Sequence, residues 1–181
     1  MPVIRSDARH GRALSAAADL LGRLRIDFMF VGNVALSGWL GAEVSSGPID
    51  LIAVLKPEQK NQVVMMGTHR GFRVDRDELD SAEELDLIPL HFVDEEGDVR
   101  VHVLVASNAL YGRMVAGAKA ATIDGREGEV RVPSAEDFAL LLIVAEDEVS
   151  ARRIMALPEF DRHSLNERLV SIGLPGMVVH E

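Results

Sequence analysis

A glycine turn between two short apolar runs limits how this chain can fold. The first run covers residues 27–31 and the second covers residues 49–55, and both have lengths typical of buried strands. Gly32-Asn33 follows the first run directly, and residues 34–40 are interpreted as a short helix that loosens at Gly41. The order of strand, turn, short helix and strand predicts helices packed against a sheet.

The rest of the chain continues this alternation. Helical spacing and end signals predict helices over residues 7–24, 57–69, 108–119, 134–144, 147–157 and 164–172, and strands are expected at 72–74, 90–93, 99–106, 121–123 and 130–132. A capping-box pattern at 81–84 predicts one more short helix, which we expect to end at Pro89.

These elements predict an α/β or α+β fold class, a mixed sheet flanked by helices. We expect one domain over residues 1–181, with a core at about 10–133 and a C-terminal helical part at 134–175.

Composition narrows the function classes. The chain has no cysteine, which excludes disulfides, thiolate metal sites and thiol nucleophiles and fits a reducing cytoplasm. Neither a secretory signal nor a membrane-spanning run is visible, so we expect a cytoplasmic protein without a membrane partner. The net charge of −10 is concentrated: residues 75–98 hold eleven acidic residues and one basic residue, which leaves eighteen of each elsewhere. This excess disfavours nucleic-acid binding.

Several landmarks carry a family resemblance. They are the turn at Gly32-Asn33, the run Ser46-Gly47-Pro48-Ile49-Asp50-Leu51, the strand around His102, and the Pro133-Ser134 approach to a C-terminal helix. In this order, over about residues 10–157, they resemble the abortive-infection type nucleotidyltransferase toxins of the DNA polymerase beta-like superfamily. The resemblance implies a nucleotidyltransferase-like fold.

The resemblance also implies a role for each matching position. Gly32, Asn33 and Ser46 would lie beside the nucleotide phosphates, and three aspartates would hold two Mg²⁺ ions about 3.5–4 Å apart. Pro48 stands in place of the first aspartate, Asp50 matches the second, and His102 replaces the third. Asp50 is therefore the one metal-ligand position retained, and Asp50 and His102 are the remnant catalytic positions.

The leading hypothesis is a catalytically degenerate pseudoenzyme with no cofactor, which binds a nucleotide, a protein partner or a second copy of itself. The alternative is an active Mg²⁺-dependent nucleotidyltransferase of a toxin–antitoxin or phage-defence system, in which Glu43 or Asp27 joins Asp50 and His102. A third hypothesis is an acidic docking module built on residues 75–98, whose simpler interpretation is a solvated surface.

Local interpretations also stay open. Asp50 and His102 are either a remnant single-metal site or a satisfied pair at a crevice, and His102 is also a candidate general base. The Gly32-Asn33 turn is either an anion site or an ordinary turn with Asn33 as the helix N-cap.

Overall fold

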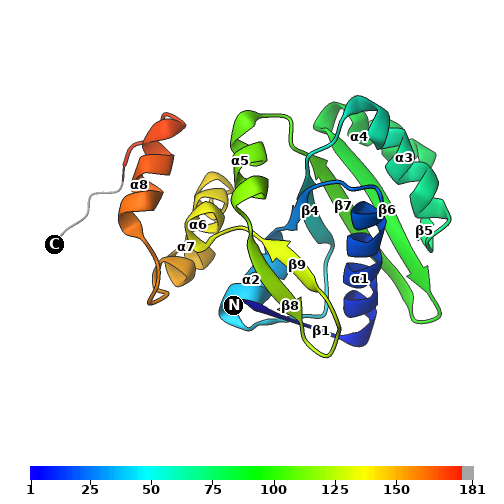
Figure 1. The fold of residues 1–181 in the computed structure, drawn as a ribbon, viewed down its shortest axis with the longest axis horizontal. Coiled ribbons are helices and arrows are strands. Elements are labelled where there is room, and N and C mark those ends of the chain that lie inside the picture. Colours follow the sequence, from blue (N-terminus) through cyan, green and yellow to red (C-terminus); the bar gives the residue numbers. More distant parts are fainter. Residues whose placement is uncertain (177–181) are drawn as a thin grey trace.

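The structure is a computed structural model, which describes residues 1–176. Its strands are β1 (Val3–Ser6), β2 (Phe28–Phe30), β3 (Glu43–Val44), β4 (Ile49–Ala53), β5 (Phe72–Arg73), β6 (Leu87–Asp94), β7 (Gly97–Val105), β8 (Lys119–Ile123) and β9 (Glu129–Val132). Its α-helices are α1 (Ala8–Arg23), α2 (Gly32–Leu40), α3 (Pro57–Thr68), α4 (Arg76–Ala82), α5 (Ala109–Gly117), α6 (Ala135–Val144), α7 (Glu148–Met155) and α8 (Arg162–Ser171). The expected fold class is confirmed: mixed sheets are flanked by helices (Figure 1).

Five strands form the larger sheet, in the order β2-β4-β7-β6-β5. β4 and β7 run parallel, and the other neighbouring pairs are antiparallel. The smaller sheet has the order β3-β1-β8-β9, with β1 parallel to both β3 and β8. Because β3 belongs to one sheet and β4 to the other, the short segment between them carries the chain from sheet to sheet.

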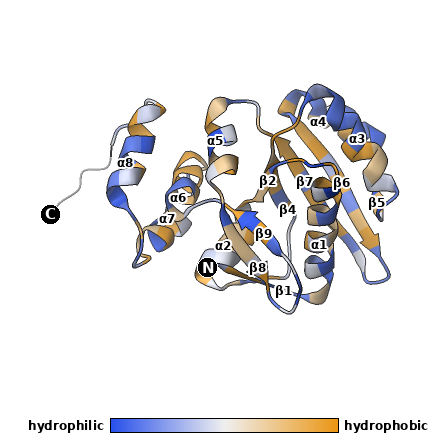
Figure 2. Cartoon of the chain, viewed as in Figure 1, coloured by the Kyte–Doolittle hydropathy of each residue, from blue (hydrophilic) through white to orange (hydrophobic). Residues whose placement is uncertain are grey.

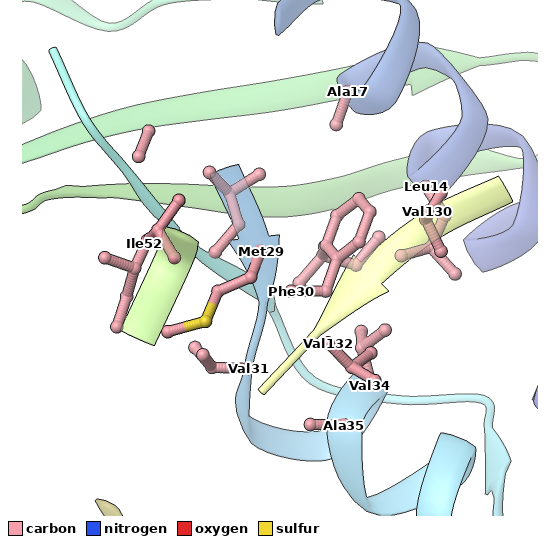
Figure 3. Packing of buried hydrophobic residues seen from close by; sticks show 14 of the residues in the cluster. Leu14, Ala17, Met29, Phe30, Val31, Val34, Ala35, Ile52, Val130 and Val132 are labelled. Atoms are coloured by element: carbon pink, nitrogen blue, oxygen red, sulfur yellow. The ribbon is translucent and has the colours of Figure 1, made fainter. Parts of the chain in front are cut away.

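The hydrophobic core joins both sheets to the helices. Phe30 of β2 is fully buried, and Figure 3 shows it close to Leu14 of α1, Val34 of α2 and Val130 of β9. Apolar residues concentrate in the central strands, whereas α3 and α4 carry long hydrophilic stretches (Figure 2). This partition follows from the removal of apolar surface from water. The core thus fixes β2, α1 and α2 around the start of β4.

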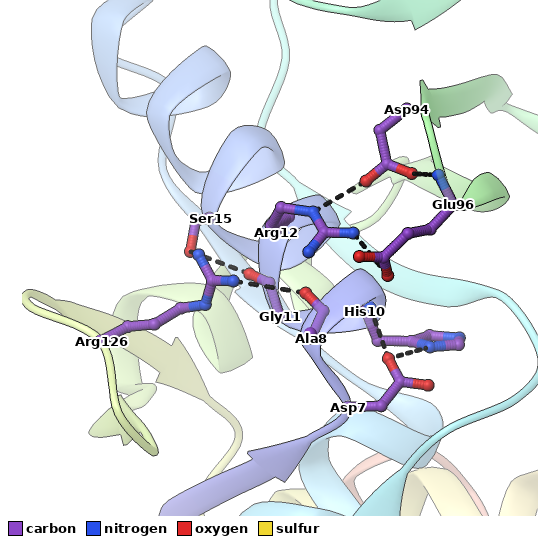
Figure 4. Close-up of polar contacts among 9 residues, drawn as sticks. All are labelled: Asp7, Ala8, His10, Gly11, Arg12, Ser15, Asp94, Glu96 and Arg126. Carbon is purple, nitrogen blue, oxygen red and sulfur yellow. Dashed lines mark hydrogen bonds and ion pairs between the residues drawn. The ribbon is translucent and has the colours of Figure 1, made fainter.

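Two polar anchors hold α1 against the hairpins. Arg12 bonds Asp94 and Glu96 at 2.8 Å each, at the turn between β6 and β7 (Figure 4). Arg126, in the turn between β8 and β9, donates to the Ser15 hydroxyl and to the Ala8 carbonyl at 3.3 Å each. Both hairpin tips are therefore tied to the N-terminal half of one helix.

The C-terminal helices carry a nearly buried ion pair. Ser134 caps α6, because its hydroxyl accepts the Asp137 N–H at 3.1 Å. The Asp137 carboxylate accepts from the same hydroxyl at 3.0 Å and from Arg168 Nε of α8 at 2.8 Å. This pair fastens α8 to α6. No helix within residues 1–176 has both the length and the apolarity that crossing a membrane requires.

Most helices lie within a few residues of their predicted bounds, but the start and the end predicted for the helix at residues 81–89 are wrong. α4 begins after Asp75, because the Asp75 carboxylate accepts the N–H groups of Asp77 and Glu78, and a 3₁₀ helix, η1 (Glu83–Leu85), follows it. Pro89 does not end a helix but lies inside β6. β5 pairs with β6 only at His91 and Phe92, so one side of β6 has no strand beside Pro89, where its missing N–H costs nothing.

Candidate functional site

The central feature of the candidate site is a contact between two neighbouring strands. Asp50 of β4 and His102 of β7 occupy directly paired positions in the parallel register. The distance between Asp50 Oδ1 and His102 Nδ1 is 2.9 Å, and about 30% of each side chain is exposed (28% for Asp50, 30% for His102). Because an ionised carboxylate only accepts, Nδ1 carries the hydrogen in this contact. The structure thus brings together the two predicted remnant positions.

Gly32 packs directly against the Asp50 carboxylate. A Cβ atom added to Gly32 would lie 3.0 Å from Asp50 Oδ2, and the φ angle of Gly32 is +56°. The Val31 N–H donates to the Asp50 carbonyl at 2.9 Å, which fixes the turn to the strand. Glycine is therefore required here by both the backbone conformation and the close approach of a side chain.

The position of Asn33 contradicts its interpretation as a helix N-cap. It lies inside α2, whose N-cap is Val31, and no side chain caps this helix. The interpretation of Asn33 as the N-cap is therefore wrong, because α2 already begins at Gly32 and Asn33 is its second residue. The Asn33 amide instead lies beside Gly47, where an added Cβ atom would be 3.3 Å from Asn33 Nδ2.

The segment before β4 holds the other two positions of interest. Ser46 is exposed in the bend between β3 and β4. Pro48 directly precedes the first residue of β4 and is half-buried, so it brings neither a carboxylate nor a backbone N–H to the start of the strand. The bend is held by His10 of α1, whose Nε2 atom lies 3.3 Å from the Gly47 carbonyl.

His10 was not predicted as part of this region. It is 2% exposed, and its Nδ1 atom contacts Asp7 Oδ1 at 3.0 Å (Figure 4). Burial opposes a low pKa for the Asp7 carboxyl, but hydrogen bonds from the His10 backbone and ring lower that pKa below its ordinary value. A single polar residue inside an amphipathic helix gives little signal in a sequence, because its partner lies 37 residues away.

Alternation along β7 creates a polar face on the larger sheet. We define the polar face by Asp50 of β4, Arg100 and His102 of β7, and His91 of β6. Successive residues of a strand point to opposite faces, so Val101 and Val103 point into the core instead, and both are buried. His91 is paired with Arg100, and Asp50 is paired with His102, so the four residues of the polar face lie on one side of the sheet.

His91 is the most buried member of the polar face. Its Nε2 atom lies 2.6 Å from Glu78 Oε2 of α4, and its Nδ1 atom lies 3.1 Å from Asp98 Oδ2. Asp98 also accepts from Arg73 at 3.2 Å. α4 is therefore tied to the polar face by a chain of ionisable groups that links Glu78, His91, Asp98 and Arg73. The alternation in residues 98–104 could have revealed Arg100, whereas the Glu78 contact depends on where α4 packs.

A cavity of about 220 Å³ lies between α4 and the polar face. Arg100, His91 and His102 of the sheet and Glu78 and Ser81 of α4 contribute its polar lining, and Leu85, Leu87 and Pro89 contribute apolar lining. His102 thus faces two neighbours, the Asp50 carboxylate and the cavity. Sequence reasoning did not predict this cavity, since its walls come from segments that meet only in the folded chain.

The residues at Asp50 do not fit a pair of Mg²⁺ ions. Within residues 1–176, no group of three or more histidine, aspartate or glutamate side chains is arranged to hold a metal. Glu43 lies in β3 of the smaller sheet and is exposed, as is Asp27, so neither completes a cluster around Asp50 and His102. One carboxylate and one imidazole fall short of the oxygen ligands that Mg²⁺ requires.

Comparisons with known proteins address the fold. No protein-family model and no curated protein sequence matches this chain. Among solved structures, 14 chains match. The crystal structure of an antigenic nucleotidyltransferase-like protein from Paracoccidioides brasiliensis is similar over 86% of this chain and 76% of that one, with 15% sequence identity and a TM-score of 0.50.

Two further structures are more distant. The Cid1 poly(U) polymerase crystal structure is similar over 78% of this chain and 41% of that one, with 13% identity and a TM-score of 0.37. A cytoplasmic RNA terminal U-transferase is similar over 57% and 33%, with 13% identity and a TM-score of 0.36. This chain spans less than half the length of either. Identities this low speak to the fold alone, and the fold of this chain is nucleotidyltransferase-like.

Proposed function

We propose that this chain is a catalytically degenerate nucleotidyltransferase that acts by binding a nucleotide or a protein partner. The observation that carries the proposal is the state of the one retained aspartate: Asp50 has a histidine, not a second carboxylate, at its paired position. We also propose that this chain is related to the abortive-infection type toxins and that it lies in the cytoplasm.

The physical argument concerns charge. In two-metal transfer, the ions stabilise both the attacking and the leaving oxygen, and clustered carboxylates hold the ions in place. Losing one major electrostatic stabiliser from an active site costs roughly 3–4 kcal/mol, which is a factor of about 10²–10³ in rate. At this site, Pro48 and His102 occupy two of the three acidic positions that the resemblance implies.

The scaffold that would position a nucleotide is retained. Gly32 keeps the backbone close to Asp50, and His10 and Asn33 both lie beside the Gly47 bend. A fold that keeps this arrangement without the acidic cluster is suited to binding more than to transfer. The described residues offer no specific observation that favours the active-enzyme alternative.

The acidic stretch offers limited support for a docking module. Within residues 1–176, four of its eleven acids form ion pairs with Lys60, Arg12 or Arg73, and Glu78 contacts His91; the four are Asp86, Asp94, Glu96 and Asp98. Asp75 caps α4. Much of the acidic excess therefore stabilises the packing of α4 and the β6–β7 hairpin, which weakens the case for a surface dedicated to a basic partner.

Restoring the acids tests the proposal. After subtraction of the heat of metal binding to ATP alone, we expect titration calorimetry to detect no tight Mg²⁺ or Mn²⁺ binding by the wild type with ATP present, and to detect it in a Pro48→Asp/His102→Asp variant. The single His102→Asp variant is the matched control, since it adds one carboxylate beside Asp50 without the other. Tight binding of two ions by the wild type would contradict the proposal.

A further inference from the structure

Arg100 is the one member of the polar face whose side chain has no partner. Within residues 1–176, the Arg100 side chain makes no hydrogen bond or ion pair with another residue, and it is exposed. His102, in contrast, is bonded to Asp50, and His91 is bonded to Glu78 and Asp98. The guanidinium group at the centre of this face is thus available to an external ligand.

The nearby acids are already engaged. Glu78 lies 2.6 Å from His91, and Asp98 contacts His91 at 3.1 Å and Arg73 at 3.2 Å. Asp50, on the neighbouring strand β4, contacts His102 at 2.9 Å. The surroundings of Arg100 therefore differ from those of a two-metal site: its guanidinium group is unpaired, whereas each neighbouring carboxylate has a guanidinium or imidazole partner.

The lining of the cavity beside Arg100 is chemically mixed. Arg100 and His102 of β7 contribute polar groups, and Leu85 and Leu87 contribute apolar surface. Glu78 of α4 also lines the cavity, and its carboxylate contacts His91. Leu85 is 70% exposed, although it is a large apolar residue. A ligand that combines an anionic group with a flat or apolar body would contact both kinds of lining.

From these observations we infer that this cavity binds the phosphate group of a nucleoside phosphate directly, without a metal ion. Arg100 supplies the charge that Mg²⁺ would otherwise supply, because a guanidinium group forms paired hydrogen bonds with phosphate oxygens. Leu85 and Leu87 contact the nucleoside. Since Mg²⁺ neutralises the phosphates and finds no carboxylate cluster here, it competes with binding. The inference rests on the nucleotide-binding form of the proposed function.

Calorimetry of the full chain at a fixed salt concentration tests this inference, with ATP and inorganic triphosphate as probes and EDTA present. The Arg100→Gln variant should bind both probes about tenfold more weakly than the wild type. Arg162→Gln is the matched control: it removes the same charge from α8, where Arg162 is exposed and makes no ion pair with the described residues. We expect it to leave the affinity within about twofold.

Two further arms separate the parts of the ligand and the role of the metal. Leu85→Ser should weaken ATP binding about threefold or more and leave inorganic triphosphate unaffected, because only ATP carries a nucleoside. Millimolar Mg²⁺ should weaken ATP binding by the wild type. Circular dichroism of each variant verifies folding.

Each other result has a defined meaning. Binding that requires Mg²⁺, equal losses in Arg100→Gln and Arg162→Gln, or no binding of either probe would overturn the inference. Metal-dependent binding without nucleotidyl transfer would leave the pseudoenzyme proposal intact. Nucleotidyl transfer by the wild type would overturn that proposal, whatever the Arg100 variant does.

Discussion

Gly32 lies directly against the Asp50 carboxylate: an added Cβ atom would lie 3.0 Å from Asp50 Oδ2, closer than most Cβ contacts in proteins. The same aspartate contacts His102 through its other oxygen at 2.9 Å. One carboxylate is therefore enclosed by a backbone turn on one side and an imidazole on the other.

Substituting Gly32 tests this close approach. Gly32→Ala should destabilise the fold by about 1–2 kcal/mol from the left-handed backbone conformation alone, with an added cost from the contact with Asp50. Gly41→Ala is the matched control at the other end of α2, because Gly41 also has a positive φ (+72°) but an added Cβ atom would meet nothing within 4 Å. Urea denaturation measures both variants. Equal destabilisation would show that Asp50 does not restrict position 32.

The ion pair between Asp137 and Arg168 should stabilise the C-terminal helices. Asp137 has a side chain only 10% exposed, so removing its cationic partner leaves a nearly buried carboxylate with Ser134 alone. Because Arg168 is partly exposed, we expect Arg168→Met to cost about 2 kcal/mol, less than a fully buried pair would. Arg162→Met, on the same helix, should change stability by less than about 0.5 kcal/mol. Thermal unfolding compares the two, and similar midpoints would refute a stabilising role for the pair.

The anchor between Arg12 and Asp94 predicts a specific acid sensitivity. The hydrogen bond from Arg12 lowers the pKa of the Asp94 carboxyl below its ordinary value of 3.8. A group whose pKa is lower in the folded state adds stability above the unfolded-state pKa, and this stability is lost as the pH falls through the folded-state pKa. Asp94→Asn should therefore be less stable than the wild type at pH 7, and the difference should shrink below about pH 4.

The control for this effect is Glu95→Gln, on the same turn, since Glu95 is exposed and forms no ion pair with the described residues. Denaturant titrations from pH 7 to pH 2 measure both differences. A gap between wild type and Asp94→Asn that stays constant with pH would rule out the Arg12–Asp94 contact as its source.

The parts of the fold that sequence predicted well are those with local signals. The helix start at Ser134 and the glycine turn at Gly32 depend on residues close in sequence, and both are present. β1 and β3 were not predicted, because strands of four and two residues are too short to carry a periodic pattern and their pairing, which brings Arg5 beside Glu43, joins segments far apart in sequence. Pro89 misled the prediction since its tolerance depends on the length of β5, a non-local property.

The residues of the candidate site were also predicted only in part. Asp50 and His102 were predicted as partners from their strands, and the register places them side by side. The contact between His91 and Glu78 was missed because it depends on α4 packing over β6. Arg100 was missed although the alternation along β7 places it on the same face as His102. Charge counting alone treated residues 75–98 as one acidic block, although four of these acids form ion pairs with lysine or arginine among the described residues and Glu78 contacts His91.

The most direct test of the account is nucleotidyl transfer by the purified wild-type chain, measured with radiolabelled ATP, GTP, CTP and UTP in the presence of Mg²⁺ and beside Asp50→Ala. The account predicts that the wild type transfers no more label than Asp50→Ala, since Asp50 lacks the acidic neighbours that two-metal chemistry requires. Transfer by the wild type that disappears in Asp50→Ala would contradict it.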